Sequence, residues 1–551
     1  MSMSKDYRVD IDYLLQRDLI TGLIPRVGKD VWQVVYAIDD KSPDRFAIFS
    51  ALLEPHVVQD ALNEDSWDLH IGDGLPGFSQ TWQSGKETTI YHRFGTEGIR
   101  PLVICRDFHD VWPSYIELCE EFRHFHNLAE DRKNQRFLDF DESGYEIEVA
   151  KIFERRVEIN WRYLRRFLAA TQLYLAVYFD SVRYSRMNLE DVPKKQRLLK
   201  HRDATSHYSL HVRTCDFHEE FRTFSRLLGK VIIAPPPIEA CDEWPFYEKC
   251  MEPEVSFVIG ANPDGTLIEH TSSPDKLANY FGANPGAPNY LTPVYFRREV
   301  LQKYFAEPER YSVEDGYLRC LGLWGMQIDN NHPTHVVAFL GDLGRDLPYA
   351  ERLHWRQYNV PPPRDARMSE TCSQRSFLAQ FSDPSSVDLI FRNEYQELNH
   401  AWRERLGWPL FLAPDPGDEH IFKAIHVPVS QSQRELDEQI LWLAKLLVDS
   451  LNEAELAKGF PENDGRRGID KFESFLKSKR CDNVEEMVQF LRDLQKLRST
   501  GTAHRKGQNY QKAINRLDLA GKSAPDVMRI VLERAVDMIR TLRRFLDEIE
   551  M

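Results

Sequence analysis

The chain has 551 residues and a formal net charge of −15, with 42% hydrophobic and 28% charged side chains. One hydrophobic core does not grow to that size, so two or three domains are expected, and the globular composition excludes a largely disordered chain. The acidic balance argues against general binding of polyanions, unless basic residues gather locally.

The apolar stretches are too short for a membrane span. The longest, residues 167–179, is interrupted by Thr171 and Gln172, whereas a spanning helix needs about 20 apolar residues. The N-terminal MSMSKDYRVDIDYLL lacks the cationic and apolar blocks of a signal peptide. The eight cysteines include no C-x-x-C pair, so neither a disulfide framework nor a zinc ribbon is indicated. We expect a cytoplasmic protein with no membrane partner, no metal and no other cofactor.

The first 190 residues predict an α+β domain, because alternating apolar runs occur beside helical patterns. The strand-like runs cover residues 31–38, 88–94 and 100–105, and the helical patterns cover residues 114–128 and 160–178. Residues 191–207, DVPKKQRLLKHRDATSH, are basic and polar. This composition suits an exposed linker or a phosphate-contacting arm, and we predict a linker.

Residues 208–430 predict a second α/β or α+β domain that ends in an irregular stretch. Turn sequences within it indicate two hairpins. One is expected to pair residues 255–260 with 266–270, and the other to pair residues 318–328 with 335–340.

Residues 431–551 predict an all-α bundle. Apolar residues recur at spacings of three and four on a first helix, which Ser432 can cap, and the stripe consists of Leu436, Ile440, Leu443, Leu447 and Leu451. Further helices are expected at residues 469–479, 483–497, 510–519 and 525–549. The expected fold class is therefore α+β and multi-domain: mixed α/β N-terminal and middle regions are followed by an all-α C-terminal helical bundle.

Basic residues gather within this bundle. Residues 434–551 carry 22 basic and 21 acidic side chains, and the window 489–516 carries seven basic residues and one acidic residue. Inside that window, Gly501 and its neighbours favour a helix break, which places Arg498 and His504 at a helix junction. A histidine that titrates near neutrality can move a proton, and an arginine can stabilise a phosphate through paired hydrogen bonds. We predict a catalytic pair here.

The bundle with Arg498, five intervening residues and His504 resembles the HEPN domain, a metal-independent RNA-cleaving module. The resemblance covers about the last 120 residues. It implies that two bundles pair to form one composite site, where an RNA 2′-hydroxyl attacks the adjacent phosphate and leaves a 2′,3′-cyclic end. His504 would act in proton transfer and Arg498 would hold the phosphate. Ser499 departs from the Asn, Asp or His that many family members carry after the arginine.

Four further residues are expected to contact RNA, through the backbone or by stacking on a base: Lys496, Arg505, Lys506 and Tyr510. A solvated helix face is the alternative for each of them. The same Arg–His spacing also occurs at Arg202 with His207 and at Arg213 with His218, so the context in the bundle is what singles out Arg498 and His504.

Two other constellations have side chains that are typical of metal or phosphodiesterase sites. His207, His211, Cys215 and His218 have zinc-binding side chains, but on a strand residues four apart lie about 13 Å from one another and cannot share an ion. Asp329, His332, His335 and Asp342 cluster around the second predicted hairpin, and structural turn residues are the favoured interpretation.

The resemblance thus implies a HEPN-type endoribonuclease of an antiviral-defence, abortive-infection or toxin kind. Its expected partners are an RNA substrate, a second copy of the chain bound through the bundle, and an unknown activating ligand or protein that the N-terminal region senses. A non-catalytic dimeric scaffold, whose α/β region binds a partner, is the alternative. A third hypothesis places an unrecognised enzyme in residues 205–360.

Overall fold

The computed structural model divides the chain into two compact units, which are described separately. Among the described residues, the second unit begins at Glu252, and the first contains the residues before it except Glu142–Gly144, which are assigned to the second. The structure describes residues 7–39, 43–63, 77–93, 97–241, 252–332, 334–363, 367–373, 384–414, 420–458, 467–501 and 508–548. None of the described helices combines the length and apolarity needed to cross a lipid bilayer.

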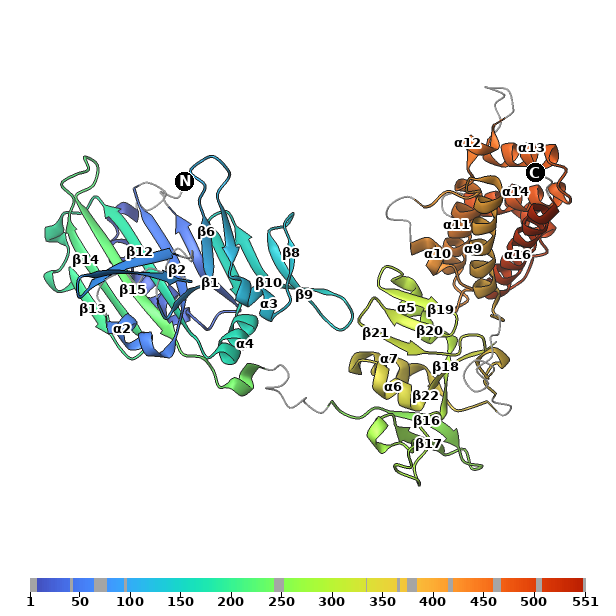
Figure 1. Cartoon of the computed structure of the whole chain (residues 1–551), viewed down its shortest axis with the longest axis horizontal. Helices are drawn as coiled ribbons and strands as arrows, with labels where there is room; N and C mark the ends of the chain where they lie inside the picture. Colours follow the sequence, from blue (N-terminus) through green and yellow to red (C-terminus); the bar gives the residue numbers. More distant parts are fainter. Residues whose placement is uncertain are drawn as a thin grey trace, which may run out of the picture. The chain divides into compact units, whose positions relative to one another are not determined.

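The first unit, here called the sheet unit, is built on an 11-stranded antiparallel sheet (Figure 1). Ten strands follow one another across it in the order β13 (Leu198–Arg202), β14 (Ser206–Thr214), β15 (Thr223–Ile233), β12 (Tyr174–Ser185), β2 (Arg45–Leu53), β1 (Trp32–Asp39), β11 (Arg156–Asn160), β10 (Glu146–Phe153), β9 (Arg136–Phe140) and β8 (Ala129–Asp131). The eleventh, β5 (Ile99–Pro101), also pairs with β2. Two hairpins stand apart, formed by β3 (Gly77–Gln83) with β4 (Lys86–His92) and by β6 (Val103–Arg106) with β7 (Tyr115–Leu118).

The sheet is covered on both faces. Helices α3 (Glu120–Phe125) and α4 (Trp161–Thr171) pack on one face, where their residues join a core that includes Leu175, Val177 and Phe179 of β12. The intervening β12 residues Ala176 and Tyr178 point to the other face, toward α2 (Val58–Asn63). Because successive strand residues point to opposite faces, β12 is apolar on both sides and reads as a continuous hydrophobic run.

That run explains one wrong prediction. The helix expected over residues 160–178 ends at Thr171, because Gln172 takes a left-handed backbone conformation (φ 55°), and Tyr174 begins β12. A short apolar run fits a buried strand as well as a helix. The helix expected over residues 114–128 is likewise divided between β7 and α3.

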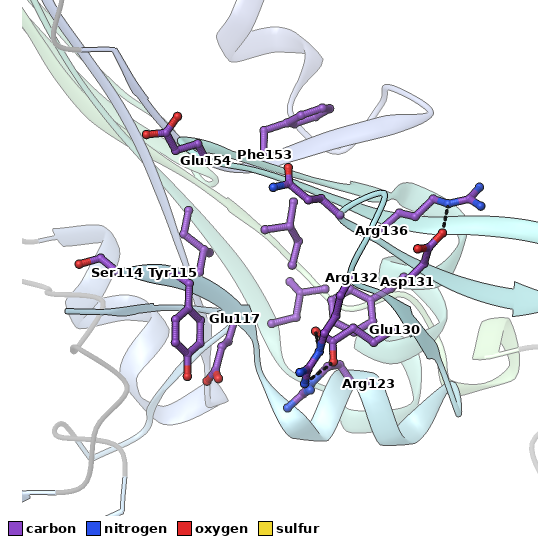
Figure 2. A pocket seen from close by; sticks show the side chains of 15 residues that line it. Ser114, Tyr115, Glu117, Arg123, Glu130, Asp131, Arg132, Arg136, Phe153 and Glu154 are labelled. Carbon is purple, nitrogen blue, oxygen red and sulfur yellow. Dashed lines mark hydrogen bonds and ion pairs between the residues drawn. The ribbon is translucent and has the colours of Figure 1, made fainter. Parts of the chain in front are cut away.

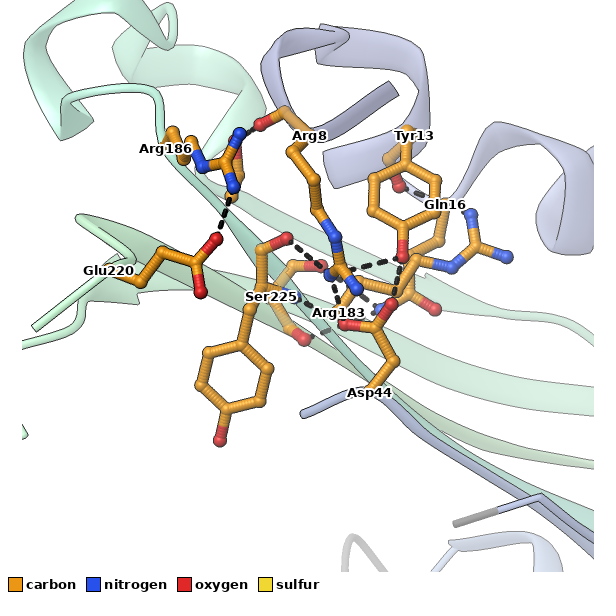
Figure 3. A network of polar contacts seen from close by, with 10 residues as sticks. Arg8, Tyr13, Gln16, Asp44, Arg183, Arg186, Glu220 and Ser225 are labelled. Carbon is orange, nitrogen blue, oxygen red and sulfur yellow. Dashed lines mark hydrogen bonds and ion pairs between the residues drawn. The ribbon is translucent and has the colours of Figure 1, made fainter. Parts of the chain in front are cut away.

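The N-terminal segment is fastened to the sheet by a polar network (Figure 3). Arg8 donates to Asp44 at 2.7 Å and to the Tyr184 carbonyl at 3.0 Å, and Tyr13 donates a short hydrogen bond to Asp44. Arg183 pairs with Asp18 through two bonds of 2.7 Å. Burial and then the Asp44 contact raise the pKa of Tyr13, so this hydroxyl remains a donor. The first helix, α1 (Ile11–Leu14), is placed by this network.

The predicted linker is wrong. Residues 198–202 form β13, which pairs with β14 along its length at the edge of the sheet. Basic and polar residues are typical of an edge strand, because they prevent it from pairing with other chains. The sheet unit therefore continues past residues 190 and 208, where the sequence predicted a domain boundary, through the last strand, β15.

The second unit begins with three small sheets. The first is the hairpin of β16 (Ser256–Ala261) with β17 (Leu267–Thr271), as predicted. The others join β22 (His335–Phe339), β18 (Pro293–Arg297) and β23 (Asn359–Val360), and β19 (Tyr311–Glu314), β20 (Tyr317–Cys320) and β21 (Trp324–Gln327). Helices α5 (Gln302–Ala306), α6 (Leu340–Asp346) and α7 (Tyr349–Tyr358) complete this part.

The second predicted hairpin is not formed as expected. Residues 318–328 contain β20 and β21, which pair with each other, whereas β22 pairs with β18. A single bridge between Asp329 and Val337 connects the two segments. Strand pairing across a longer separation outweighs the local turn signal here.

The rest of the second unit is a helical bundle, which confirms the expected fold class. Its helices are α9 (Val387–Leu406), α10 (His420–Ala424), α11 (Gln433–Ala444), α12 (Glu453–Leu456), α13 (Gly468–Ser478), α14 (Val484–Gly501), α15 (Gln508–Arg516) and α16 (Ala524–Glu548). Ser432 caps α11 as predicted, with its hydroxyl accepting from the Glu435 amide. The predicted stripe of leucines and Ile440 is buried in one core.

The bundle begins earlier than residue 431. Helix α9 packs along α16, and Phe391, Tyr395, Leu398 and Trp402 belong to the same core (Figure 1). These residues are four, three and four positions apart, which is the spacing of one helix face. The stretch predicted to be irregular therefore contains a principal helix of the bundle.

Candidate functional site

Arg498 lies in the last turn of α14. The helix continues through residues 499–501, four positions beyond its predicted end, and stops at Gly501. A cation near the C-terminus of a helix is favoured by the partial negative charge of the terminal carbonyls. The Arg498 side chain is 25% exposed and forms a short ion pair with Asp449. Its guanidinium is therefore held at the end of α14.

Asp449 is brought to this position by an irregular turn. After Ala444, α11 continues as a π-helical turn, η10 (Lys445–Asp449), in which the Ser450 amide donates to the Lys445 carbonyl at 3.1 Å. A π turn inserts a residue into the helix and redirects the side chains that follow it. Leu446, Leu447 and Val448 stay buried, while Asp449 remains half-exposed and faces Arg498. A regular leucine spacing gave no signal of this turn.

A buried carboxylate joins α14 to α15. Asp493 is 1% exposed, accepts two hydrogen bonds from Arg516 at 2.7 and 2.8 Å, and lies 3.1 Å from the ammonium of Lys496. Lys496, expected to contact RNA, therefore neutralises Asp493. The pair with Arg516 fixes α15, the helix to which Tyr510 belongs. Only the place of Tyr510 in that helix is described, and its stacking role stays a prediction.

His504, Arg505 and Lys506 lie outside the described residues. In the sequence, residues 502–507 connect α14 to α15. Both flanking helices are held by ion pairs: Arg498 of α14 pairs with Asp449, and Arg516 of α15 pairs with Asp493. The convergence of His504 with Arg498 and the RNA contacts of Arg505 and Lys506 stay predictions.

The basic window is less cationic than its composition indicates. Arg492 lies 2.8 Å from both Asp470 and Glu473 of α13, and Lys496, Arg498 and Arg516 pair as described above. Asp449, Asp470 and Glu473 lie outside the window, so a count of charges along the window leaves them out. The field that remains for a phosphate is weaker and more local.

A second polar site, which no sequence motif indicated, lies at the N-terminal end of α11. His426 is buried and stacks on Phe305, with ring centroids 3.7 Å apart. Its Nδ1 lies 2.7 Å from the Ala424 carbonyl and its Nε2 lies 3.1 Å from the Glu435 carboxylate. Both ring nitrogens therefore face oxygen atoms, which fixes the orientation of the ring.

Glu435 has further donors around it. The Val429 amide donates to it at 2.9 Å and the Ser430 hydroxyl at 2.6 Å. Burial raises the pKa of Glu435, but the hydrogen bonds from His426, Ser430 and Val429 outweigh it and leave the pKa lowered. The pair borders a cavity of about 830 Å³ lined by residues of α5, α10 and α11. Because the side chains of His426 and Glu435 already bond each other and their neighbours, we interpret the pair as structural.

The two metal-like constellations have structural partners. His207 belongs to β14, which confirms the strand interpretation, and bonds the Leu62 carbonyl at 3.0 Å. Asp329 accepts from the amide and hydroxyl of Ser369, both at 2.7 Å, and Asp342 accepts from Tyr290 at 2.9 Å. Within the described part of the chain, no three His, Cys, Asp or Glu residues are grouped to hold a metal ion.

Comparison with known proteins adds no relative: no family model, no curated protein and no solved structure matches this chain. The site is therefore defined by its own residues, a guanidinium held by Asp449 at the end of α14 and a histidine six positions later in the sequence.

Proposed function

We propose that the helical bundle cleaves RNA without a metal ion, with Arg498 binding the phosphate and His504 moving a proton. The observation that carries the proposal is the ion pair of Arg498 with Asp449, which holds the guanidinium in the last turn before the segment that contains His504. A positioned guanidinium makes paired hydrogen bonds to phosphate oxygens and stabilises the charge that develops there.

The proposed reaction is an internal transfer at phosphorus. The RNA 2′-hydroxyl loses its proton to a general base and attacks the adjacent phosphate, forming a 2′,3′-cyclic phosphate. The bond to the 5′-oxygen breaks, and that oxygen takes up a proton. His504 performs one of these proton transfers, and the same residue of a second chain, paired through the bundle, supplies the other. The remaining residues of the chain then act as a sensing or inhibitory region, which fits an antiviral defence role.

The test uses the purified full-length protein with total RNA in the presence of a chelator. We expect 2′,3′-cyclic ends, detected by a ligation that requires them. Arg498→Ala and His504→Ala should each lower the cleavage rate by a factor of roughly 10² or more, because each removes a group that acts on the reacting phosphate.

Two matched variants control for surface changes. His400→Ala removes a histidine on α9 that is 75% exposed, and Arg529→Ala removes a half-exposed arginine on α16. Both should cleave like the unmodified protein. Cleavage that survives in His504→Ala, with folding and oligomeric state unchanged, contradicts the proposal.

A non-catalytic scaffold is the second candidate, and one observation favours it. Four basic residues of the window already pair with carboxylates of the same chain, as fixed helix contacts do. In that case Arg498→Ala would change stability or dimerisation, measured by light scattering, and RNA would stay intact with every variant and with the unmodified protein.

A further inference from the structure

A cleft in the sheet unit has the dimensions of a small-molecule site. It has a volume of about 530 Å³ and lies between β7, the last turn of α3, the β8–β9 hairpin and the end of β10 (Figure 2). Pockets of about 300 to 1,000 Å³ are typical for small ligands. Its residues take no part in the proposed RNA chemistry.

The floor of the cleft is apolar. Leu118 and Phe137 are buried, and Ile116 and Ile152 pack against the same core. Tyr115, on the β7 wall, stacks on Phe108 with ring centroids 5.6 Å apart and remains exposed. The floor therefore favours an apolar body over a sugar or an inorganic ion.

Most charges around the cleft already neutralise one another. Arg132 lies 3.2 Å from Glu130, Arg136 lies 2.9 Å from Asp131, and Arg106 lies 3.6 Å from Glu117. Figure 2 shows Arg123, Glu130 and Arg132 gathered at one end of the cleft, with the Arg136–Asp131 pair beside them. Each of these arginines is therefore already engaged by a carboxylate.

Arg123 differs from its neighbours. Its guanidinium carbon lies 5.9 Å from the centre of the Phe137 ring, and its buried Nε has no hydrogen-bond partner. Among the described residues, no carboxylate forms an ion pair with it. A guanidinium fixed against an aromatic ring and lacking an anion is suited to bind one, because its planar fork matches a carboxylate or a phosphate.

The surrounding carboxylates decide between these two anions. Glu117, Glu130, Asp131 and Glu154 all line the cleft, so a doubly charged phosphate ester would meet more repulsion than a singly charged carboxylate. We propose that this cleft binds a small carboxylic acid with an apolar or aromatic body. The carboxylate pairs with Arg123, and the body lies on the floor formed by Phe137 and Ile152.

Titration calorimetry of the full-length protein tests this with four probes: 3-phenylpropanoate, hexanoate, 3-phenylpropanol and phenyl phosphate. We expect saturable binding of 3-phenylpropanoate and of hexanoate, and at least tenfold weaker binding of the alcohol and of the phosphate. Arg123→Gln should weaken carboxylate binding at least tenfold, whereas Arg132→Gln, which changes an exposed arginine of the same lining, should not.

A second variant tests the place of the apolar body without touching the cation. Ile152→Trp fills the floor and should abolish binding while a thermal melt shows the sheet unit folded. Equal binding of the acid and the alcohol, tighter binding of phenyl phosphate, unchanged binding by Arg123→Gln, or no binding of either carboxylate to the unmodified protein each overturns the proposal. RNA cleavage depends on other residues, so the two proposals fail separately.

Discussion

The sheet unit and the second unit each bury a histidine, in contrasting surroundings. His126 follows α3, bonds the Tyr163 carbonyl at 3.0 Å and is enclosed by the rings of Phe122 and Phe125. The pKa of His126 is lowered to about 4, chiefly by burial and in part by Arg166, while the bond to the Tyr163 carbonyl and the charge of Asp139 oppose the shift. His426 faces the carboxylate of Glu435 instead. Burial among rings disfavours the charged form of His126.

The largest effect is expected from breaking the pair in the second unit. Glu435→Ala leaves His426, the Val429 amide and the Ser430 hydroxyl without their acceptor, and should lower the stability of the second unit by about 3 kcal/mol or more. Hydrogen-exchange mass spectrometry measures this by peptide, and the peptides of the sheet unit serve as the internal control. Glu435→Gln, which keeps one oxygen acceptor, should cost less. Equal loss of protection in both units would show that they unfold together.

Acid should destabilise the two units to different extents. Because the pKa of His126 in the folded state lies below its ordinary value of about 6.5, the unfolded chain binds more protons between about pH 6.5 and 4. The stability of the sheet unit therefore falls as the pH falls through this window, by up to about 3 kcal/mol. The pKa of Glu435 is lowered in the folded state. Its hydrogen bonds therefore stabilise the second unit at every pH above the ordinary pKa of a glutamate, about 4.3, and this contribution is lost only below about pH 4.

Unfolding of the two units, followed by hydrogen exchange at pH 7, 6 and 5, measures this difference. His126→Gln should flatten the pH dependence of the sheet unit, because an amide can donate to the Tyr163 carbonyl without titrating. A sheet unit whose stability is the same at pH 7 and pH 5 would contradict the assignment to His126.

The smallest effect on stability is expected at the exposed pair of the candidate site. Asp449→Asn should change the stability of the bundle by less than about 1 kcal/mol, because exposed ion pairs contribute little. It should nevertheless lower RNA cleavage about tenfold, since the guanidinium of Arg498 loses the contact that positions it. Glu404→Gln, at the exposed His400–Glu404 pair on α9, is the matched control and should change neither quantity. A stability loss as large as that of Glu435→Ala would place Asp449 among the structural residues.

The helices of the bundle could be predicted from the sequence, because the signals of a helix are local. The spacing of Leu436 and Ile440 and the cap at Ser432 lie within one turn or two of each other, and the structure has both. Phe391, Tyr395 and Leu398 have the same spacing and lie in α9, a helix that we did not predict.

The sheet unit was harder to predict, because strand pairing joins residues far apart in the chain. Nothing near Leu198 indicates that β13 completes an edge of the sheet, and nothing near Tyr174 separates a strand buried on both faces from a helix. The anion-binding candidate Arg123 became visible only when β7, the β8–β9 hairpin and β10 were brought together around it.

The sequence by itself determined the α+β class, the helical C-terminal region and the basic window around Arg498, since composition and periodicity carry these. Only the tertiary structure decided which charges in that window are neutralised, because Asp449, Asp470 and Glu473 reach it from other segments of the chain. Coulomb interactions fall with distance in space rather than along the sequence, so the field at a site depends on the fold that surrounds it.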